Sequence, residues 1–246
     1  MPFLKSAILS AALLAAPVLH AQEMTPAERQ AFRAEVRAYL LENPEVLTEA
    51  IAILEQRQAT DAATKDIQLV ADNNAAIFQD KNSWVGGNPD GDVTIVEFMD
   101  YRCGYCRKAF EEVEELMRSD GNIRFVIKEF PILGESSDLS SRFAIATLQL
   151  AGPEAYMRVH EALITLRGEA TNPTLERLAG DLGLDTAAIM ARMGAPEVTA
   201  VIQTNRALAD KLEISGTPTF VFKGTMLRGY LPLEDMRAVV AEQRKG

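Results

Sequence analysis

The stretch that decides the fold is Val93–Cys106, which reads VTIVEFMDYRCGYC. Residues 93–98 are mostly β-branched or apolar, which predicts a strand, and residues 107–118 have the pattern of a helix. The chain has two cysteines, and both lie at this junction, as Cys103 and Cys106. A sulfur at a helix N-terminus faces unpaired N–H groups and the positive end of the helix dipole, which favour the reactive thiolate. The arrangement therefore indicates redox chemistry.

Two other uses of a cysteine pair fit this sequence less well. A zinc site needs four ligands, and the histidines that could complete it are His20 and His160. His20 falls in a segment that we expect to be removed, so we expect no metal. A purely structural disulfide would close a very short loop, which constrains the unfolded chain little.

The first residues resemble an export signal. Lys5 precedes a short apolar run from Ala7 to Ala16, and Ala21 is a small residue suited to cleavage. We therefore expect residues 1–21 to be a signal peptide and the mature chain to begin near Gln22, soluble outside the cytoplasm. A membrane anchor or a buried helix is the alternative.

Composition excludes several classes of protein. The formal net charge is −10, with 25 basic and 35 acidic residues among 246. An acidic chain without a basic run argues against binding to nucleic acid or to anionic membrane surfaces. A single close cysteine pair in an exported chain is more often functional than part of a structural disulfide framework.

The N-terminal part, residues 22–82, is predicted to be helical. Thr25-Pro26-Ala27-Glu28 combines a capping residue, a helix-starting proline and a capping-box glutamate. Apolar residues then recur at helical spacing, and the steps of four and three from Ala63 to Ile77, with Asn74 among them, are typical of a coiled-coil seam. We interpret the segment as an oligomerisation element followed by a linker at residues 82–92. A helical hairpin packed on its own domain is the alternative.

The remaining chain, residues 83–246, predicts an α/β domain. A second strand at 123–128 follows the helix, so a parallel strand pair with a crossover helix is expected. Residues from about 137 to 212 are helical in pattern. Two short strands at 219–222 and 226–229 then precede a final helix that Pro232 opens.

These elements resemble a thioredoxin fold with a helical insertion, as found in the DsbA family of exported thiol–disulfide oxidoreductases. The matching motifs are TIVEFMDY at 94–101, the CGYC itself, KEFPILG at 128–134 and GTPTF at 216–220. The Gly-Tyr dipeptide and the threonine before Pro218 resemble the isomerase DsbC and ScsC-type proteins, whose oligomerising stalk the N-terminal segment also resembles. The expected fold is thus a thioredoxin fold with an inserted helical subdomain, preceded by an all-helical segment.

The resemblance implies roles for the cysteines and their neighbours. Cys103 is expected to be the more exposed nucleophile, with a lowered pKa, and Cys106 the thiol that resolves the mixed disulfide. Gly104 and Tyr105 are expected to set how strongly the thiolate is stabilised. The redox-active disulfide itself carries the chemistry, so no cofactor is expected.

Three further positions support the pair. Pro218 is expected to follow a cis peptide bond that brings the backbone of Thr217 beside Cys103, where an extended substrate can pair with it. Strand alternation turns Glu97 away from its neighbours toward the other face of the sheet, and the family carries an acid there that assists proton transfer to Cys106. Lys128 is a candidate partner for Glu97, and an exposed strand-end glutamate is the alternative.

Two other residues are assigned structural roles. His160 is interpreted as a histidine on a helix surface or one with its hydrogen bonds satisfied. Trp84 is interpreted as a packing residue near the domain junction rather than a substrate platform.

The sequence thus predicts a periplasmic thiol–disulfide exchange enzyme, most simply an isomerase or reductase. Its expected partners are unfolded or wrongly disulfide-bonded exported proteins and a membrane thiol reductase of the DsbD or ScsB type. A homotrimer is expected, with a dimer second. The alternatives are a DsbA-type oxidase with a quinone-linked membrane partner, and a holdase or structural protein whose disulfide is inert.

Overall fold

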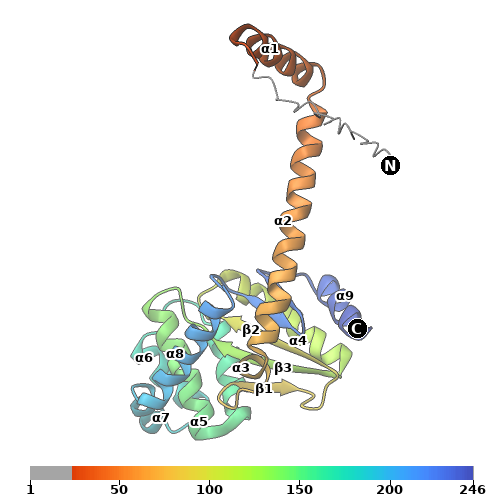
Figure 1. Cartoon of the computed structure of the whole chain (residues 1–246). Helices are drawn as coiled ribbons and strands as arrows, with labels where there is room; N and C mark the ends of the chain where they lie inside the picture. Colours follow the sequence, from red (N-terminus) through yellow and green to blue (C-terminus); the bar gives the residue numbers. More distant parts are fainter. Residues whose placement is uncertain (1–23, 246) are drawn as a thin grey trace, which may run out of the picture. The chain divides into compact units, whose positions relative to one another are not determined.

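The computed structural model describes residues 24–245 (Figure 1). The chain divides into two compact units, Met1–Arg57 and Gln58–Gly246, and each is described by itself. The predicted signal peptide, residues 1–21, lies outside the described residues. No helix within 24–245 has the length and apolar character needed to cross a membrane.

The described part of the first unit, from Met24 onward, is helical, as predicted. Helix α1, Pro26–Glu42, begins with the expected capping box between Thr25 and Glu28. Helix α2, Glu45–Asp72, follows after Asn43 ends α1 and continues into the second unit. None of the α1 residues is buried. The large apolar side chains of this unit that are exposed to solvent are Met24, Phe32, Val36, Tyr39, Leu41, Leu47, Ile51, Ile53 and Leu54.

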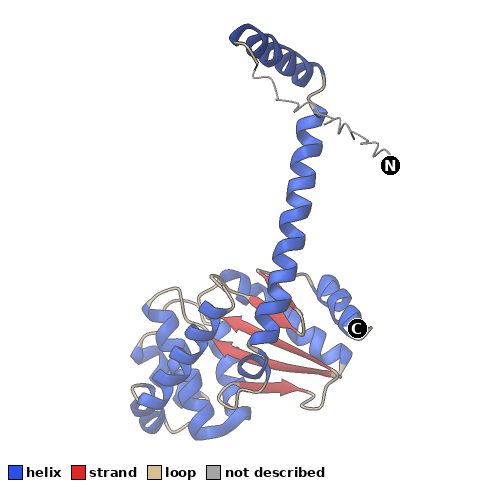
Figure 2. Ribbon diagram, viewed as in Figure 1, coloured by secondary structure: helices blue, strands red, loops and turns tan. Residues whose placement is uncertain are grey.

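The second unit is built on a five-stranded mixed sheet in the order β1-β3-β2-β4-β5 (Figure 2). The central pair, β2 and β3, is parallel, as the strand–helix–strand pattern predicts, and the other three pairings are antiparallel. The strands are β1 Trp84–Gly87, β2 Val93–Met99, β3 Ile123–Glu129, β4 Thr219–Phe222 and β5 Thr225–Arg228.

Helices cover both faces of this sheet. Helices α4 and α9 and most of the helical insertion share one hydrophobic core with one face, which includes Ile95, Met99 and Ile127. The other face, which includes Val96 and Phe98, packs against the end of α8 and the segment that contains α3. The helices of this unit after α2 are α3 Asn74–Phe78, α4 Gly104–Asp120, α5 Glu135–Ile164, α6 Asn172–Asp181, α7 Thr186–Met193, α8 Pro196–Lys211 and α9 Leu233–Gln243.

The stretch predicted as a linker, residues 82–92, contains a strand that the sequence analysis missed. Strand β1 pairs antiparallel with the edge of β3. The strand was not predicted because it contains Gly86 and Gly87, and glycine in a sequence usually indicates a turn. Its first residue, Trp84, packs as predicted: the indole stacks on Tyr156 with centroids 5.8 Å apart and donates a hydrogen bond to the Pro153 carbonyl, 3.0 Å away.

The predicted coiled-coil seam is wrong at its C-terminal end. Helix α2 ends at Asp72, and Val70 and Ile77 are buried against the second face of the sheet. An ion pair between Asp66 and Arg228 also fastens this end of α2 to the domain. Two of the five predicted seam positions are therefore buried by this chain's own sheet, whereas Ala63, Ile67 and Asn74 are exposed.

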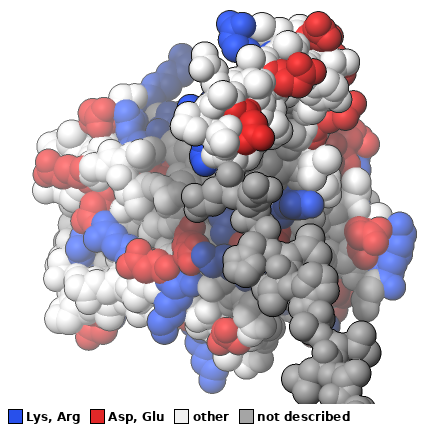
Figure 3. All heavy atoms as spheres, turned by 45° about the horizontal axis from the view of Figure 1, so that its top comes forward, with Lys and Arg blue, Asp and Glu red and all other residues white. Residues whose placement is uncertain are grey.

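The insertion consists of α5 to α8, between β3 and β4. Its first helix is interrupted at Gly152, whose φ of 83° is left-handed, directly before Pro153. Basic and acidic side chains are interspersed over the described part of the face shown in Figure 3.

Candidate active site

The two cysteines stand at the start of α4. Cys103 is the N-cap residue, its backbone carbonyl accepts the first helical hydrogen bond from Arg107, and Cys106 lies in the first turn. Both are free thiols in this structure. Cys103 is 7% exposed and Cys106 2% exposed, so Cys103 is the more accessible, as expected, but only narrowly.

The surroundings make Cys103 a strong acid for a thiol. A hydrogen bond from the Cys106 thiol is the largest cause, and the Thr217 side chain and the backbone N–H groups of Cys106 and Tyr105 add to it. Together they outweigh burial and lower the pKa of Cys103 to about 5. Cys103 is therefore a thiolate at neutral pH, because its pKa is about two units below the pH.

The second thiol has the opposite tendency. Burial raises the pKa of Cys106 far above its ordinary value, and the neighbouring charges of Glu97 and Cys103 raise it further. Cys106 is thus protonated while Cys103 is ionised. One sulfur is ready to attack, and the other must lose a proton before it can.

The loop before β4 completes the site. The Thr217–Pro218 peptide bond is cis, as the motif predicts. The Cys103 Sγ lies 3.1 Å from the carbonyl oxygen of Thr217. Thr219 begins β4 and pairs with Phe98 of β2, so the loop is held at the same end of the sheet as the cysteines.

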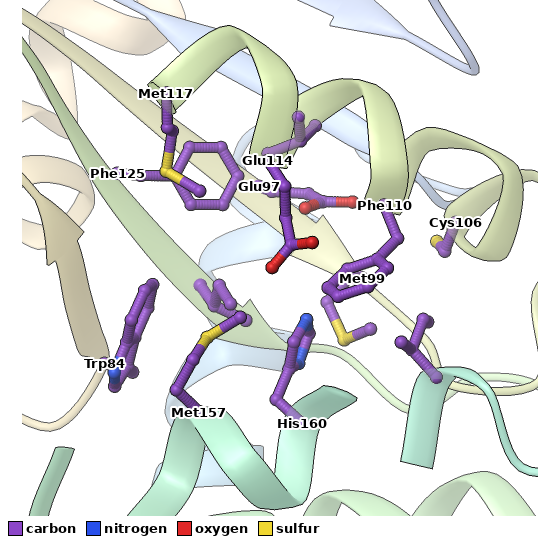
Figure 4. A pocket seen from close by; sticks show the side chains of 13 residues that line it. Trp84, Glu97, Met99, Cys106, Phe110, Glu114, Met117, Phe125, Met157 and His160 are labelled. Carbon is purple, nitrogen blue, oxygen red and sulfur yellow. The ribbon is translucent and has the colours of Figure 1, made fainter. Parts of the chain in front are cut away.

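Glu97 lies behind the cysteines on β2 and is 7% exposed. It lines a small cavity of about 10 Å³ with Cys106, Met99 and His160 (Figure 4), which is about the space that one water needs. Burial raises the pKa of Glu97 to about 8, and negative charge on Cys103 adds to the rise. Near neutral pH this carboxyl can both take and give a proton.

The predicted pairing of Glu97 with Lys128 is wrong. In the β2–β3 register Lys128 is opposite Phe98, so it points to the other face of the sheet from Glu97. There its Nζ donates to an Asp80 carboxylate oxygen 2.5 Å away and to the Ala76 carbonyl. A one-residue offset in a strand reverses the face.

The dipeptide between the cysteines faces solvent. Gly104 is exposed, and Tyr105 is 63% exposed and stacks on Tyr230 with ring centroids 6.4 Å apart. The Lys108 Nζ lies 3.9 Å from the centre of the Tyr230 ring. An aromatic pair with a cation therefore flanks the attacking sulfur.

Sequence reasoning missed Asp100. Its side chain is fully buried and accepts hydrogen bonds from the backbone N–H groups of Arg102, Ile132 and Leu133 and from the Ser137 hydroxyl. It thereby ties the turn before Cys103 to the loop after β3. Its position directly after a buried strand is the signal that could have identified it, since chemistry gathers at strand ends in α/β sheets.

Within residues 24–245, no group of three or more His, Cys, Asp or Glu side chains is placed to hold a metal ion. The residues that the site brings together are instead two thiols, the buried acids Glu97 and Asp100, and a backbone carbonyl. That set can form and break disulfides.

Residues 79–242 match the family model described as Thioredoxin. The chain belongs to the thioredoxin family. Residues 28–60 match a second model, the N-terminal domain of copper resistance protein ScsC. The resemblance to DsbA-family and ScsC-type proteins that was inferred from the four motifs is therefore confirmed, together with the thioredoxin fold.

Solved structures agree with this assignment. A thioredoxin-like oxidoreductase from Silicibacter pomeroyi is 44% identical, with a TM-score of 0.66 over 71% of this chain and 99% of that one. ScsC from Proteus mirabilis, in a transitional conformation, is 27% identical, with a TM-score of 0.65 over 89% and 96%. The thiol–disulfide exchange protein α-DsbA2 from Wolbachia pipientis is 25% identical, with a TM-score of 0.68 over 73% and 96%.

Curated sequences give a different kind of relative. The Na⁺/H⁺ antiporter NhaA 1 of Salinispora arenicola is 30% identical over 169 residues, which are 66% of this chain. This chain spans about a quarter of the length of that protein.

Proposed function

We propose that this protein exchanges disulfides with exported client proteins in the periplasm, and that it acts chiefly as a disulfide isomerase and reductase. The observation that carries the proposal is the contrast between the two sulfurs. Cys103 has a pKa lowered to about 5, whereas the pKa of Cys106 is raised well above its ordinary value.

The steps follow from this contrast. The Cys103 thiolate attacks one sulfur of a client disulfide, the client S–S bond breaks, and the second client sulfur leaves as a thiolate. The mixed disulfide is then resolved in one of two ways. Another client thiolate attacks and a rearranged client leaves, which is isomerisation, or Cys106 attacks and a reduced client leaves. In the second case the Cys106 proton passes to Glu97, the nearby acid that faces the same cavity.

Client segments would bind beside Cys103 in extended form. The carbonyl of Thr217, already 3.1 Å from the sulfur, offers a backbone acceptor to an added strand. The exposed Tyr105 supplies an adaptable apolar contact. Because the Cys103–Cys106 pair must be reduced to start, the cell must supply electrons, for which we propose a membrane thiol reductase of the DsbD or ScsB type.

We propose that the N-terminal unit assembles several copies of the chain into a homo-oligomer, for which a trimer is favoured over a dimer. Its apolar side chains are exposed, and Phe32, Val36, Leu40 and Leu47 line one groove of about 360 Å³ between α1 and the start of α2. An amphipathic surface of this kind needs a partner. The match of residues 28–60 to the ScsC N-terminal model supports a second copy as that partner.

A DsbA-type oxidase is the second candidate, and one observation favours it. A Cys103 pKa of about 5 lies between the roughly 7 of thioredoxin and the roughly 3.5 of DsbA. A more stable thiolate favours the reduced form of the protein, and so makes its disulfide a stronger oxidant.

The test uses the full chain with Val36→Glu and Leu40→Glu together, which place charge in the groove, and Gln30→Glu on the same helix as the matched control. Solution mass, isomerisation of scrambled ribonuclease and oxidation of a reduced peptide are measured for each. The proposal expects the double variant to become monomeric and to lose isomerisation but not oxidation, while the control behaves as wild type. Isomerisation that persists in a monomeric variant would refute the need for assembly, and a wild type that only oxidises would establish the second candidate.

A further inference from the structure

A third buried acid, after Glu97 and Asp100, lies close to the active site, and the steps above do not use it. Glu129 is the last residue of β3 and is 3% exposed. Its Oε1 accepts hydrogen bonds from the hydroxyls of Tyr101, at 2.9 Å, and Tyr156, at 2.5 Å, and its Oε2 accepts one from Ser141 at 2.7 Å. Three donors for one carboxylate are what a buried anion needs to persist.

Glu129 and Glu97 lie on the same face of the sheet. The parallel register pairs Glu97 with Ile127 and Met99 with Glu129, so the two acids are on adjacent strands and two residues apart. Strand spacing and rise place their Cα atoms about 8 Å apart. Two like charges at that distance in a protein interior disfavour each other's ionisation.

A polar path leads from Glu129 to the cavity that Glu97 lines. The Tyr101 hydroxyl, which contacts Glu129, also lies 3.0 Å from His160 Nδ1. His160 lines the cavity that Glu97 and Cys106 share (Figure 4). Hydrogen bonds through Tyr101 to His160 therefore link Glu129 to the cavity behind the resolving thiol.

Most of these partners come from the helical insertion. Ser141, Tyr156 and His160 all belong to α5, whereas Tyr101 precedes the cysteines. The titratable groups that act on or pack around the two acids are Asp100, Tyr101, Cys103, Cys106, Glu114, Tyr156 and His160. Lys128, which adjoins Glu129 in sequence, pairs with Asp80 on the other face of the sheet.

We propose that Glu129 is a positioning residue that acts through Glu97: its charge sets how readily Glu97 takes the proton of Cys106. The inference rests on the proposed function of the Cys103–Cys106 pair. In the step concerned, the Cys106 proton moves to the Glu97 carboxylate, the Cys106 sulfur uses its electron pair to bond Cys103, and the client sulfur leaves with the pair of the broken S–S bond.

The directions of the pKa shifts agree with this coupling. Negative charge on Glu129 is one of the causes that raise the pKa of Glu97. Burial raises the pKa of Glu129 itself to about 7, although its three hydroxyl donors oppose the rise. Both acids therefore titrate near neutral pH, where the ionisation of one resists the ionisation of the other.

The experiment follows the release of thionitrobenzoate from its mixed disulfide with Cys103, in the full chain, as a function of pH. Release requires Cys106 to attack, so its rate should rise as Glu97 ionises. Glu129→Gln removes the repelling charge and should move the rise to lower pH by roughly one unit. Tyr156→Phe keeps the acid but removes a donor that favours its ionised form, so it should give a smaller shift in the same direction. Glu176→Gln, the same change at an exposed site on α6, should give none.

A double variant separates coupling from structural damage. In a Glu97→Gln background, adding Glu129→Gln should leave the pH profile unchanged, because the group it acts through is gone. A shift of equal size in that background, or no shift in the Glu129→Gln and Tyr156→Phe single variants, would overturn the inference. If wild type releases no thionitrobenzoate at any pH, the proposed function fails instead.

Discussion

The acidity of Cys103 is the property that most directly tests the site, and Cys106→Ala is the perturbation that addresses its main cause. The hydrogen bond from the Cys106 thiol is the largest of the effects that lower the pKa of Cys103 from 9.0 to about 5. Alanine removes that donor and leaves the backbone N–H groups of the α4 N-terminus in place. The pKa of Cys103 should therefore rise but stay well below its ordinary value.

The size of the rise follows from the strength of one hydrogen bond. A hydrogen bond to a charged group contributes about 1.5–3 kcal/mol, and a thiol is a weak donor, so the low end applies. One pKa unit corresponds to about 1.4 kcal/mol, which gives a rise of about one unit, to roughly 6. At pH 5 the thiolate fraction should then fall from about one half to about one tenth, a roughly fivefold loss.

The assay is the pH dependence of alkylation of reduced protein by iodoacetamide, with Cys106→Ser as the matched control. Serine keeps a donor at the same position, so its curve should stay near that of wild type. Identical curves for the alanine and serine variants would refute the hydrogen bond as the cause. A wild-type midpoint near the ordinary thiol value would refute the thiolate itself, and with it the proposed order of attack.

Three further changes test the structure around the site. Asp80→Asn leaves Lys128, whose side chain is 1% exposed, without its anion, and should lower the free energy of unfolding by about 3 kcal/mol in denaturant titrations. Gly87→Ala should destabilise the domain by more than about 1 kcal/mol, because φ there is +69° and a Cβ would lie 2.3 Å from the Ile123 carbonyl oxygen. Glu97→Gln should raise the stability of the reduced protein at pH 9 by a few kcal/mol and leave it unchanged at pH 4, since the folded pKa of about 8 is above the ordinary 4.5. In the wild type, the contribution of Glu97 to the free energy of unfolding should be complete below pH 4.5 and should be lost as the pH rises through 8.

Asp80→Asn and Gly87→Ala each have a control in the same chain. Lys65→Met breaks an exposed ion pair with Glu213 and should cost less than about 1 kcal/mol. Gly180→Ala lies in α6, where a Cβ meets no atom within 4 Å, and should be neutral or stabilising. Equal effects of Asp80→Asn and Lys65→Met, or of the two glycine changes, would contradict the reasoning from burial and backbone conformation.

Most of the sheet and the cysteine site could be read from sequence because the signals are local. The spacing of Cys103 and Cys106, the strand before them and the motif around Pro218 each depend on neighbouring residues. The cis bond and the turning of Glu97 away from Val96 were predicted on that basis, and the structure has both. Capping residues such as Thr25 also allowed the ends of helices to be predicted to within a residue or two.

What sequence could not give depends on register and on distant partners. Strand β1 has few apolar residues of its own and exists because it pairs with β3. The burial of Val70 and Ile77 depends on a sheet face formed some twenty to one hundred and fifty residues later in the chain. The sequence around Asp100 and Glu129 does not show which groups either acid contacts. The fold shows that each carboxylate accepts several hydrogen bonds from residues distant in sequence.

The error over Lys128 shows how register decides the chemistry of the site. Had the lysine stood at position 127 or 129, it would share a face with Glu97 and hold that carboxyl ionised at neutral pH, as a nearby cation does. In the observed register Lys128 is neutralised by Asp80 on the far face. Glu97 is thus left among Cys103, Cys106 and Glu129, where burial and negative charge keep its pKa near 8. A carboxyl that titrates there can accept the proton of a resolving thiol at neutral pH and return it in the reverse step.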